Sequence, residues 1–318
     1  MLSFAALVTA VTTVATENSS SDDAGEPLYA VPTSRDRVGR IVVPVMVNGR
    51  GPFHFVFDTG ANTTVLSPHL AEAIGLTVET AHLVTMSGVT GSLPVPTAHV
   101  ERVQAGAVVL DNAQLAVADA SIVGTDGILG VDGLKDKLVV ADFVHDRIEV
   151  LDAKTRRPAP HLVRLHARSR FGDLMVVDAS VGSIRVNAVV DTGGQRTLGN
   201  RALYRAMRLR PNLTVRDETS VVIGATDTRQ EGERYVVPRI ALTEELHVTN
   251  LAVIFGDFFI FKLWDLEDHP ALVLGMDMIG TLDVFAVDYL RREVQIRGGR
   301  EWAARAGPLA ANWRASWR

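Results

Sequence analysis

The 318-residue chain contains no cysteine, which excludes disulfide bonds, thiolate metal sites and cysteine nucleophiles. Basic residues do not predominate either, and the net charge of -5 argues against a nucleic-acid-binding protein. Beyond residue 15 no apolar run is long enough to cross a bilayer, so we expect no integral membrane span. The nine histidines form no pair at metal-ligand spacing, and the sequence predicts neither a metal nor another cofactor.

The first 15 residues are apolar and uncharged. They are too few for a transmembrane helix but fit the apolar region of a secretory signal, with Thr13-Val14-Ala15 as a small-residue cleavage site. The Lys or Arg that normally precedes such a region is missing. We expect a signal peptide at 1–15 and a periplasmic or secreted protein; a frayed apolar terminus is the alternative.

The chain does contain many short runs of Val, Ile and Leu separated by Gly, Pro and Asn. Such runs are typical of β-strands, and examples are Ile41–Val47, Phe53–Phe57, Val108–Leu110 and Leu138–Val140. One short helix is predicted at Pro68–Ile74, with Ser67 as its N-cap. This pattern predicts an all-β fold.

The sequence also repeats itself. An apolar run followed by Asp-Thr-Gly occurs twice, and a Thr follows each Asp after six residues. Later in each copy come two apolar residues, a Gly and, two positions on, an Asp. The landmarks are Asp58-Thr59-Gly60, Thr64, Ile128-Leu129-Gly130 and Asp132, then Asp191-Thr192-Gly193, Thr197, Val273-Leu274-Gly275 and Asp277. Their common order indicates gene duplication and predicts two similar lobes.

The repeat suggests how the chain is divided. We assign 38–152 to a first lobe and 171–297 to a second, joined by a linker at 153–170 that is rich in turn-forming residues. Residues 16–37 are polar with little apolar periodicity and are predicted to be a linker as well. The last segment, 298–318, is a tail containing Trp and Arg.

Each Asp-Thr-Gly follows a predicted strand, so its carboxylate lies where that strand ends, and its glycine permits a tight turn. If the lobes pack about a pseudo-twofold axis, Asp58 and Asp191 face each other. Two carboxylates a few ångströms apart cannot both ionise cheaply and therefore share one proton. One can then deprotonate a water molecule while the other hydrogen-bonds a scissile carbonyl.

In these motifs the chain resembles the retropepsin-like aspartic peptidases, with both halves fused in one chain as in pepsin-like enzymes. The resemblance implies a bilobal fold, in which two similar β-barrel lobes related by pseudo-twofold symmetry enclose a cleft. It implies an aspartic endopeptidase that acts on peptide or protein substrates. A monomer is expected because both lobes belong to one chain.

The resemblance also implies roles for single residues. Asp58 and Asp191 would be the catalytic pair. The active-site loops would be supported by Thr59 and Gly60 in the first copy and by Thr192 and Gly193 in the second. Ala61 and Gly194 stand where pepsin-like relatives commonly carry a hydroxyl residue.

The family also has a β-hairpin flap that closes over the substrate. The best match is Thr85–Gly91, with Met86, Ser87 and Gly88 as substrate-binding flap residues, although Met86 has packing as its alternative role. Its counterpart in the second copy is Ile223–Asp227. The second lobe carries a longer stretch before its apolar-Gly pair, which includes Phe255–Phe261.

Two functions of different kinds fit these observations. One is an active aspartic endopeptidase. The other is a non-catalytic module that keeps the cleft and holds extended peptides without cleaving them. The presence of both aspartates favours the enzyme.

Overall fold

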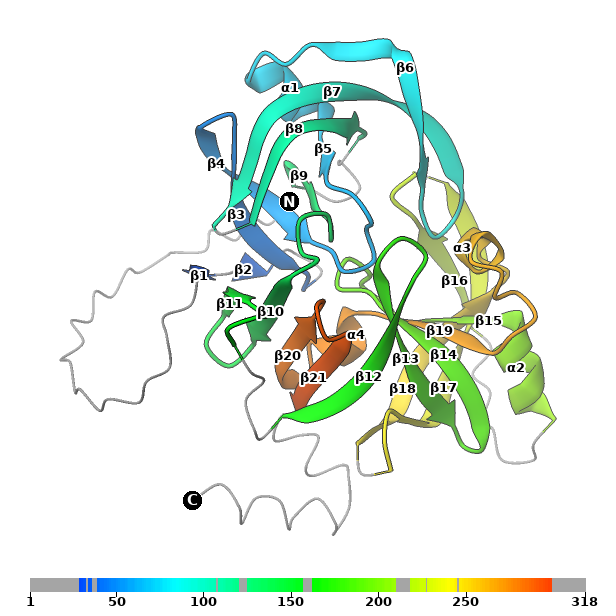
Figure 1. Cartoon of the computed structure of the whole chain (residues 1–318). Helices are drawn as coiled ribbons and strands as arrows, with labels where there is room; N and C mark the ends of the chain where they lie inside the picture. The colour runs from blue at the N-terminus through cyan, green and yellow to red at the C-terminus, as the bar shows by residue number, and fades with distance from the viewer. Residues whose placement is uncertain are drawn as a thin grey trace, which may run out of the picture.

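The computed structural model describes residues 29–32, 34–35, 39–106, 108–119, 125–156, 162–209, 218–226, 228–244 and 246–298. Figure 1 shows two lobes made mainly of β-strands, which confirms the predicted all-β bilobal fold. Within these residues none of the helices is long and apolar enough to cross a membrane. The predicted signal peptide and nearly all of the C-terminal tail lie outside the described residues.

The first lobe contains an eight-stranded sheet, of which six strands close into a barrel. The barrel order is β3-β4-β9-β5-β8-β7, and β7 pairs back with β3. Alternating buried side chains on these strands, for example along β3, fill the barrel interior. The bounds are β2 Ser34–Arg35, β3 Ile41–Val47, β4 Arg50–Phe57, β5 Val65–Leu66, β6 Val78–Ser87, β7 Ser92–Ala105, β8 Val108–Val117 and β9 Gly127–Leu129.

The second lobe repeats this order strand for strand. Its ring is β13-β14-β19-β15-β18-β17, and β17 pairs back with β13. In both lobes the strand that precedes Asp-Thr-Gly pairs in parallel with the strand of the apolar-Gly motif, so the sequence duplication is a structural one. The bounds are β13 Leu174–Val181, β14 Ile184–Val190, β15 Leu198–Asn200, β16 Glu218–Ile223, β17 Arg229–Ala241, β18 His247–Gly256 and β19 Ala271–Leu274.

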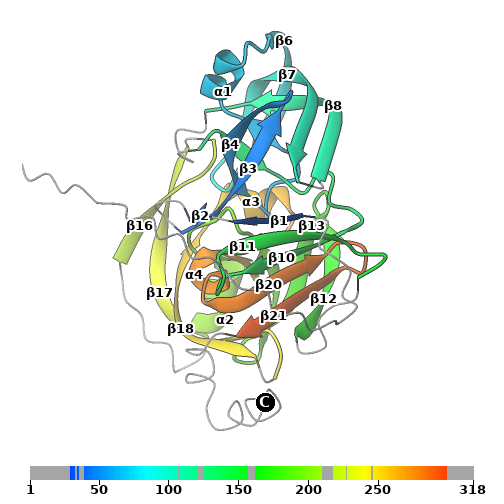
Figure 2. The same ribbon diagram turned by 90° about the vertical axis from the view of Figure 1, so that its left-hand side faces the viewer.

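A third layer joins the lobes, and Figure 2 shows its strands side by side. Its order is β1-β11-β10-β20-β21-β12. At its centre β10 pairs antiparallel with β20, its counterpart in the other copy, so main-chain hydrogen bonds cross from lobe to lobe. The bounds are β1 Tyr29–Pro32, β10 Lys137–Asp142, β11 Arg147–Asp152, β12 Val163–Arg170, β20 Leu282–Asp288 and β21 Glu293–Gly298.

The structure departs from the linker assignments in two places. Strands β1 and β2 lie within 16–37, and β12 lies within 153–170. In β12 the buried Leu165 and Ala167 alternate with the exposed Arg164 and His166. Because only every second side chain is apolar, the segment looked polar in sequence, while its backbone pairs with β13 and β21.

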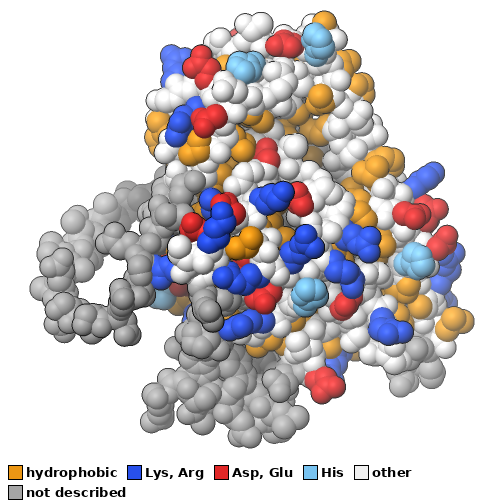
Figure 3. All heavy atoms as spheres, viewed as in Figure 1, with side chains coloured by type: hydrophobic (Ala, Val, Ile, Leu, Met, Phe, Trp, Pro, Cys, Tyr) orange, Lys and Arg blue, Asp and Glu red, His pale blue; other side chains and the backbone are white. Residues whose placement is uncertain are grey.

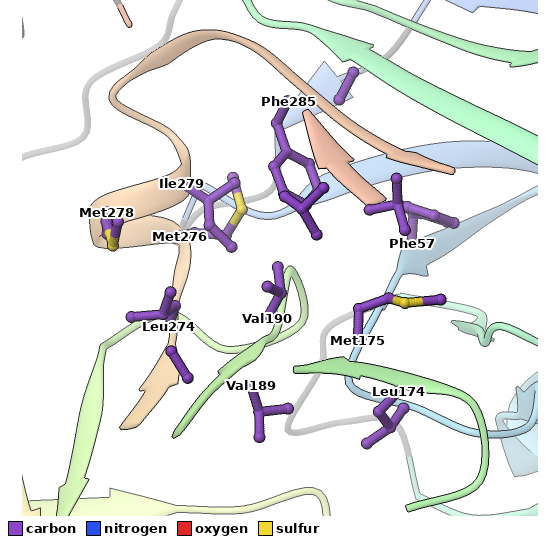
Figure 4. Packing of buried hydrophobic residues seen from close by; sticks show 14 of the residues in the cluster. Phe57, Leu174, Met175, Val189, Val190, Leu274, Met276, Met278, Ile279 and Phe285 are labelled. Atoms are coloured by element: carbon purple, nitrogen blue, oxygen red, sulfur yellow. The ribbon is translucent and has the colours of Figure 1, made fainter. Parts of the chain in front are cut away.

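The largest apolar cluster is shared by both lobes. Phe57 and Val190, the residues directly before the two aspartates, are both buried in it. The same cluster contains Phe285 of β20 and Met276 of the short helix α4 (Met276–Ile279), and Figure 4 shows all four residues. The two Asp-Thr-Gly turns therefore start from one continuous core.

Two equivalent helices follow the active-site loops. Helix α1 (Pro68–Ala73) begins where the sequence predicted, and the Ser67 hydroxyl accepts a hydrogen bond from the Leu70 amide at 3.0 Å. Helix α2 (Arg201–Arg208) is capped in the same way by Asn200, which accepts from the Leu203 amide at 2.9 Å. A third helix, α3 (Phe259–Leu263), lies between β18 and β19 and has no counterpart among the residues described in the first lobe.

The two caps predict unequal losses of stability. Ser67→Ala removes one capping bond and should cost about 1 kcal/mol. Asn200→Ala should cost roughly 2–4 kcal/mol, because the amide group of Asn200 also donates to the carbonyls of Leu266 and His269, both at 2.6 Å, in a buried position. Urea unfolding of both variants measures this order; equal losses would contradict it.

Candidate active site

The two Asp-Thr-Gly turns meet between the lobes. Asp58 follows β4, and its amide donates to the Leu129 carbonyl at 3.0 Å. Asp191 follows β14, and its amide donates to the Leu274 carbonyl at the same distance of 3.0 Å. Each aspartate is thus fixed on the parallel strand beside it, which carries the apolar-Gly motif.

Thr59 and Thr192 join the turns by four crossed hydrogen bonds. The amide of Thr59 donates to the Thr192 hydroxyl at 3.0 Å, and the amide of Thr192 donates to the Thr59 hydroxyl at 3.1 Å. Each hydroxyl in turn donates to a carbonyl of the opposite lobe: Thr59 to Val190 at 2.9 Å and Thr192 to Phe57 at 2.7 Å. Both side chains are buried, so each position requires a side chain that both donates and accepts hydrogen bonds.

The carboxyl groups of Asp58 and Asp191 meet beside Gly60, where a Cβ atom would lie 2.7 Å from an oxygen of Asp191 and 3.1 Å from an oxygen of Asp58. Burial and then the charge of Asp58 raise the pKa of Asp191 well above its usual range. Burial also raises the pKa of Asp58, but a hydrogen bond from the Gly60 amide, at 2.7 Å, opposes that shift. The two carboxyls therefore titrate as a pair, and the raised pKa belongs to the pair rather than to either residue alone.

The glycines of the two turns pack against these carboxyls. A Cβ atom at Gly60 would lie 2.7 Å from an Asp191 oxygen, and one at Gly193 would overlap the carboxyl of Asp58. The amides of Gly193 and Gly194 both donate to Asp191, each at 2.9 Å. Any side chain at Gly60 or Gly193 would displace the carboxyl group of the opposite lobe.

Asp132 binds the first active-site loop on the side away from Asp58, a role that sequence analysis did not assign. Thr64 donates to its carboxylate through the amide at 2.9 Å and through the hydroxyl at 2.7 Å. The same hydroxyl accepts from the Gly130 amide at 3.3 Å. The loop after Asp58 is thereby held on the strand that passes beneath it.

The second lobe repeats this arrangement with Asp277. The Thr197 amide and hydroxyl donate to its carboxylate at 3.0 and 2.7 Å, and the hydroxyl accepts from the Gly275 amide at 3.2 Å. The only sequence signal for these two aspartates was their equal spacing in the two copies. Equal spacing suggests that the two aspartates make equivalent contacts, but it does not say which atoms they bind.

The predicted flap residues lie at the end of a hairpin formed by β6 and β7. Met86 and Ser87 end β6, and the amide of Gly88 donates to the Gly91 carbonyl at 2.8 Å to close the turn. Met86 is half-buried and packs, together with Leu93, on the apolar cluster that Ala61 also joins. The packing role of Met86 is therefore present, and its contact with substrate stays a prediction.

In the described part of the chain, His, Asp and Glu side chains form no group of three or more that could hold a metal ion. The sequence model of the family described as Aspartyl protease matches residues 43–132 and 177–278. These two regions cover more than half of the chain and contain one Asp-Thr-Gly each. The chain belongs to the aspartyl protease family.

Membership of the family confirms the resemblance seen in the sequence. It assigns the protein to the peptidases as a general class of enzyme. The two matched regions correspond to the two structural copies, so each lobe is a family unit in its own right. A comparison with curated proteins found no match.

The raised pKa of Asp191 predicts how stability depends on pH. A carboxyl that binds its proton more tightly when folded stabilises the fold at low pH, and this contribution is lost as pH rises through the raised value. Asp191→Asn should therefore raise the midpoint of thermal unfolding at pH 7 by a few degrees, with the difference shrinking towards pH 4.

The control for this measurement is Asp268→Asn, since the Asp268 side chain is 85% exposed. It should show no comparable dependence on pH. An Asp191→Asn variant that is less stable than the native protein at pH 7, but not at pH 4, would contradict the raised pKa of Asp191.

Proposed function

We propose that this protein is an aspartic endopeptidase that hydrolyses peptide bonds with a water molecule activated by Asp58 and Asp191. The observation that carries the proposal is that two carboxyl groups with unequal environments meet where the lobes join, with oxygens of both within about 3 Å of the place a Cβ atom would take at Gly60. Two groups that share one proton can act as base and acid in the same step.

The proposed reaction starts with the proton on Asp191 and a charge on Asp58. The Asp58 carboxylate takes a proton from a water molecule, whose oxygen attacks the scissile carbonyl carbon. The Asp191 hydroxyl donates its proton to the carbonyl oxygen, which gives a neutral tetrahedral diol. Asp58 then returns its proton to the amide nitrogen, the carbon–nitrogen bond breaks, and Asp191 recovers a proton from the diol as the carboxylic acid product forms.

We propose that the substrate binds as an extended strand between the lobes. About six to eight residues would cross the lobes at ~3.3 Å per residue. Beside the first active-site loop the walls are apolar, with Ala61, Met86 and Leu93 in one cluster. Figure 3 shows apolar side chains gathered between the upper and lower parts of the molecule. This lining favours apolar residues beside the cleaved bond.

Two further points belong to the proposal. The apolar residues 1–15 support export to the periplasm or secretion. A monomer is sufficient for catalysis, because one chain supplies both aspartates and both lobes. The alternative function, a peptide-binding module without catalysis, predicts binding of the same extended peptides with no new termini.

The decisive test is digestion of a peptide library across pH, read by mass spectrometry. Asp58→Asn and Asp191→Asn should each remove nearly all turnover, because neither carboxyl can both accept and donate the required protons alone. The double variant should resemble either single variant, since residues that act as a unit are not additive.

Substantial turnover by either single variant would rule out a shared dyad. Binding of library peptides without cleavage by the native protein would establish the binding module instead. Asp268→Asn serves as the control for the loss of one carboxylate.

The pH profile of kcat/KM tests how the pair is tuned. Burial raises the pKa of both aspartates, so the singly protonated pair should persist into mildly acidic pH and give a bell-shaped profile there. Ala61→Ser supplies a hydroxyl that favours the ionised carboxylate and should move the profile to lower pH.

Ala61→Val is the matched control, because it adds bulk without a hydroxyl. The equivalent change at Gly194 is unsuitable, because a Cβ atom there would lie 2.8 Å from an oxygen of Asp191. If Ala61→Ser leaves the profile in place or moves it upward, the hydroxyl argument fails even if the dyad stands.

A further inference from the structure

Strand β12 carries a basic side chain at every second position of its solvent-facing side. These residues are Arg164, His166, Arg168 and Arg170, and the side chains between the first three are buried. Figure 3 shows Lys and Arg side chains gathered over the part of the molecule where Figure 1 draws β12. Because the chain as a whole has a net charge of -5, this local excess of basic residues is not a consequence of its composition.

Two further arginines widen this row. Arg185 is exposed on β14, two positions before Asn187, and Arg168 donates to the Asn187 side chain at 3.0 Å. Arg185 and Arg168 therefore lie on the same face of the sheet. Arg292 is exposed beside β12, since its carbonyl accepts from the Ala167 amide at 2.8 Å. We call the five arginines the basic face: Arg164, Arg168, Arg170, Arg185 and Arg292.

One arginine of the basic face has a carboxylate partner. Arg168 donates to the two carboxylate oxygens of Asp178 at 3.1 and 2.7 Å, which fixes its guanidinium group on the sheet. Within the part of the chain that the structure describes, the other four arginines make no ion pair. Their guanidinium donors are therefore open to a partner from outside the chain.

The basic face begins beside the active site. The residue after Arg170 is Phe171, whose carbonyl accepts a hydrogen bond from the side-chain amide of Asn62. Asn62 lies in the first active-site loop, four positions after Asp58. A Cβ atom at Gly172 would overlap the Asn62 amide nitrogen, so the β12–β13 turn packs closely on this loop. A peptide that leaves the space between the lobes past Asn62 meets the basic face next.

We propose that the basic face binds an acidic segment of a protein substrate, outside the space between the lobes and next to the segment that is cleaved. An extended chain repeats every second side chain at about 6.6 Å, which is also the spacing along β12. Asp or Glu at alternate positions would therefore match the row of arginines. A guanidinium group can bind a carboxylate through two parallel hydrogen bonds. This role rests on the proposed peptidase function and gives it a class of substrate.

The charge of the whole chain favours a short acidic segment over a larger anionic partner. Charges in solution interact over about 8–10 Å at physiological salt, so a short segment meets mainly the field of the basic face. A nucleic acid or an anionic membrane covers more of the surface and also meets the net negative charge of the rest of the protein.

Peptides that share one cleavable sequence test the proposal. That sequence comes from the library digestion and is extended, at either end in turn, by alternating Glu and Ser or by alternating Gln and Ser. At one of the two ends the Glu extension should raise kcat/KM about tenfold over the Gln extension, mainly through a lower KM. Raising the salt from about 20 to about 500 mM should remove most of the difference, because salt screens exposed charges.

Paired substitutions locate the effect. Arg164→Gln with Arg170→Gln should reduce the ratio between the two extensions to about twofold or less. The matched control is Arg102→Gln with Arg205→Gln, which removes two exposed arginines from β7 and α2 and should keep the native ratio. Equal cleavage of both extensions by the native protein would overturn the acidic segment. An unchanged ratio in the first variant, or an equal loss in both, would overturn the basic face.

Binding separates this proposal from the peptidase proposal. A fluorescent peptide of alternating Glu and Ser should bind the native protein, read by anisotropy, and bind several-fold more weakly to Arg164→Gln with Arg170→Gln. If the native protein cleaves no peptide, the peptidase proposal fails and this measurement alone decides the basic face. Binding of phosphatidylglycerol vesicles or of an oligonucleotide, without binding of the acidic peptide, would overturn the choice of partner.

Discussion

The crossed hydrogen bonds between Thr59 and Thr192 are the constraint on which the rest of the site depends. Each side chain bonds the backbone of the other lobe, so the two turns can be placed correctly only together. Burial makes the loss of any one partner expensive, because the remaining donor or acceptor would have no water to replace it. The relative position of the lobes is therefore set within hydrogen-bonding tolerance at the point where Asp58 and Asp191 meet.

That precision holds together two groups that repel each other when ionised. Asp191 is buried and Asp58 is half-buried, and each receives amide hydrogen bonds from its own turn. The amides limit the cost of the one charge, and burial prevents the second. Asp132 and Asp277 bind the two active-site loops through Thr64 and Thr197 and hold them on the core strands. The loops can therefore keep Asp58 and Asp191 together despite the repulsion between their charges.

The site was largely predictable because its geometry is local. A strand followed by Asp-Thr-Gly fixes where a carboxylate lies, and the duplication shows that there are two of them. The Ser67 cap was predictable for the same reason. Strand β12 was assigned to a linker because exposed arginines stand between its buried apolar residues and make the segment look polar. The hydrogen bond from the Gly224 amide to the Thr90 hydroxyl could not be predicted from the sequence. It joins residues 134 positions apart and depends on how the two lobes pack.

The contact of the β6–β7 hairpin with α3, in which the Ile260 amide donates to the Val89 carbonyl at 3.1 Å, has a consequence for symmetry. In a dimer of identical halves, whatever one half offers to its partner the partner must offer in return. Such a dimer would have to make the contact twice, once on each side of its axis. Joining the halves in a single chain removes this obligation, so a contact that one lobe makes need not be repeated by the other.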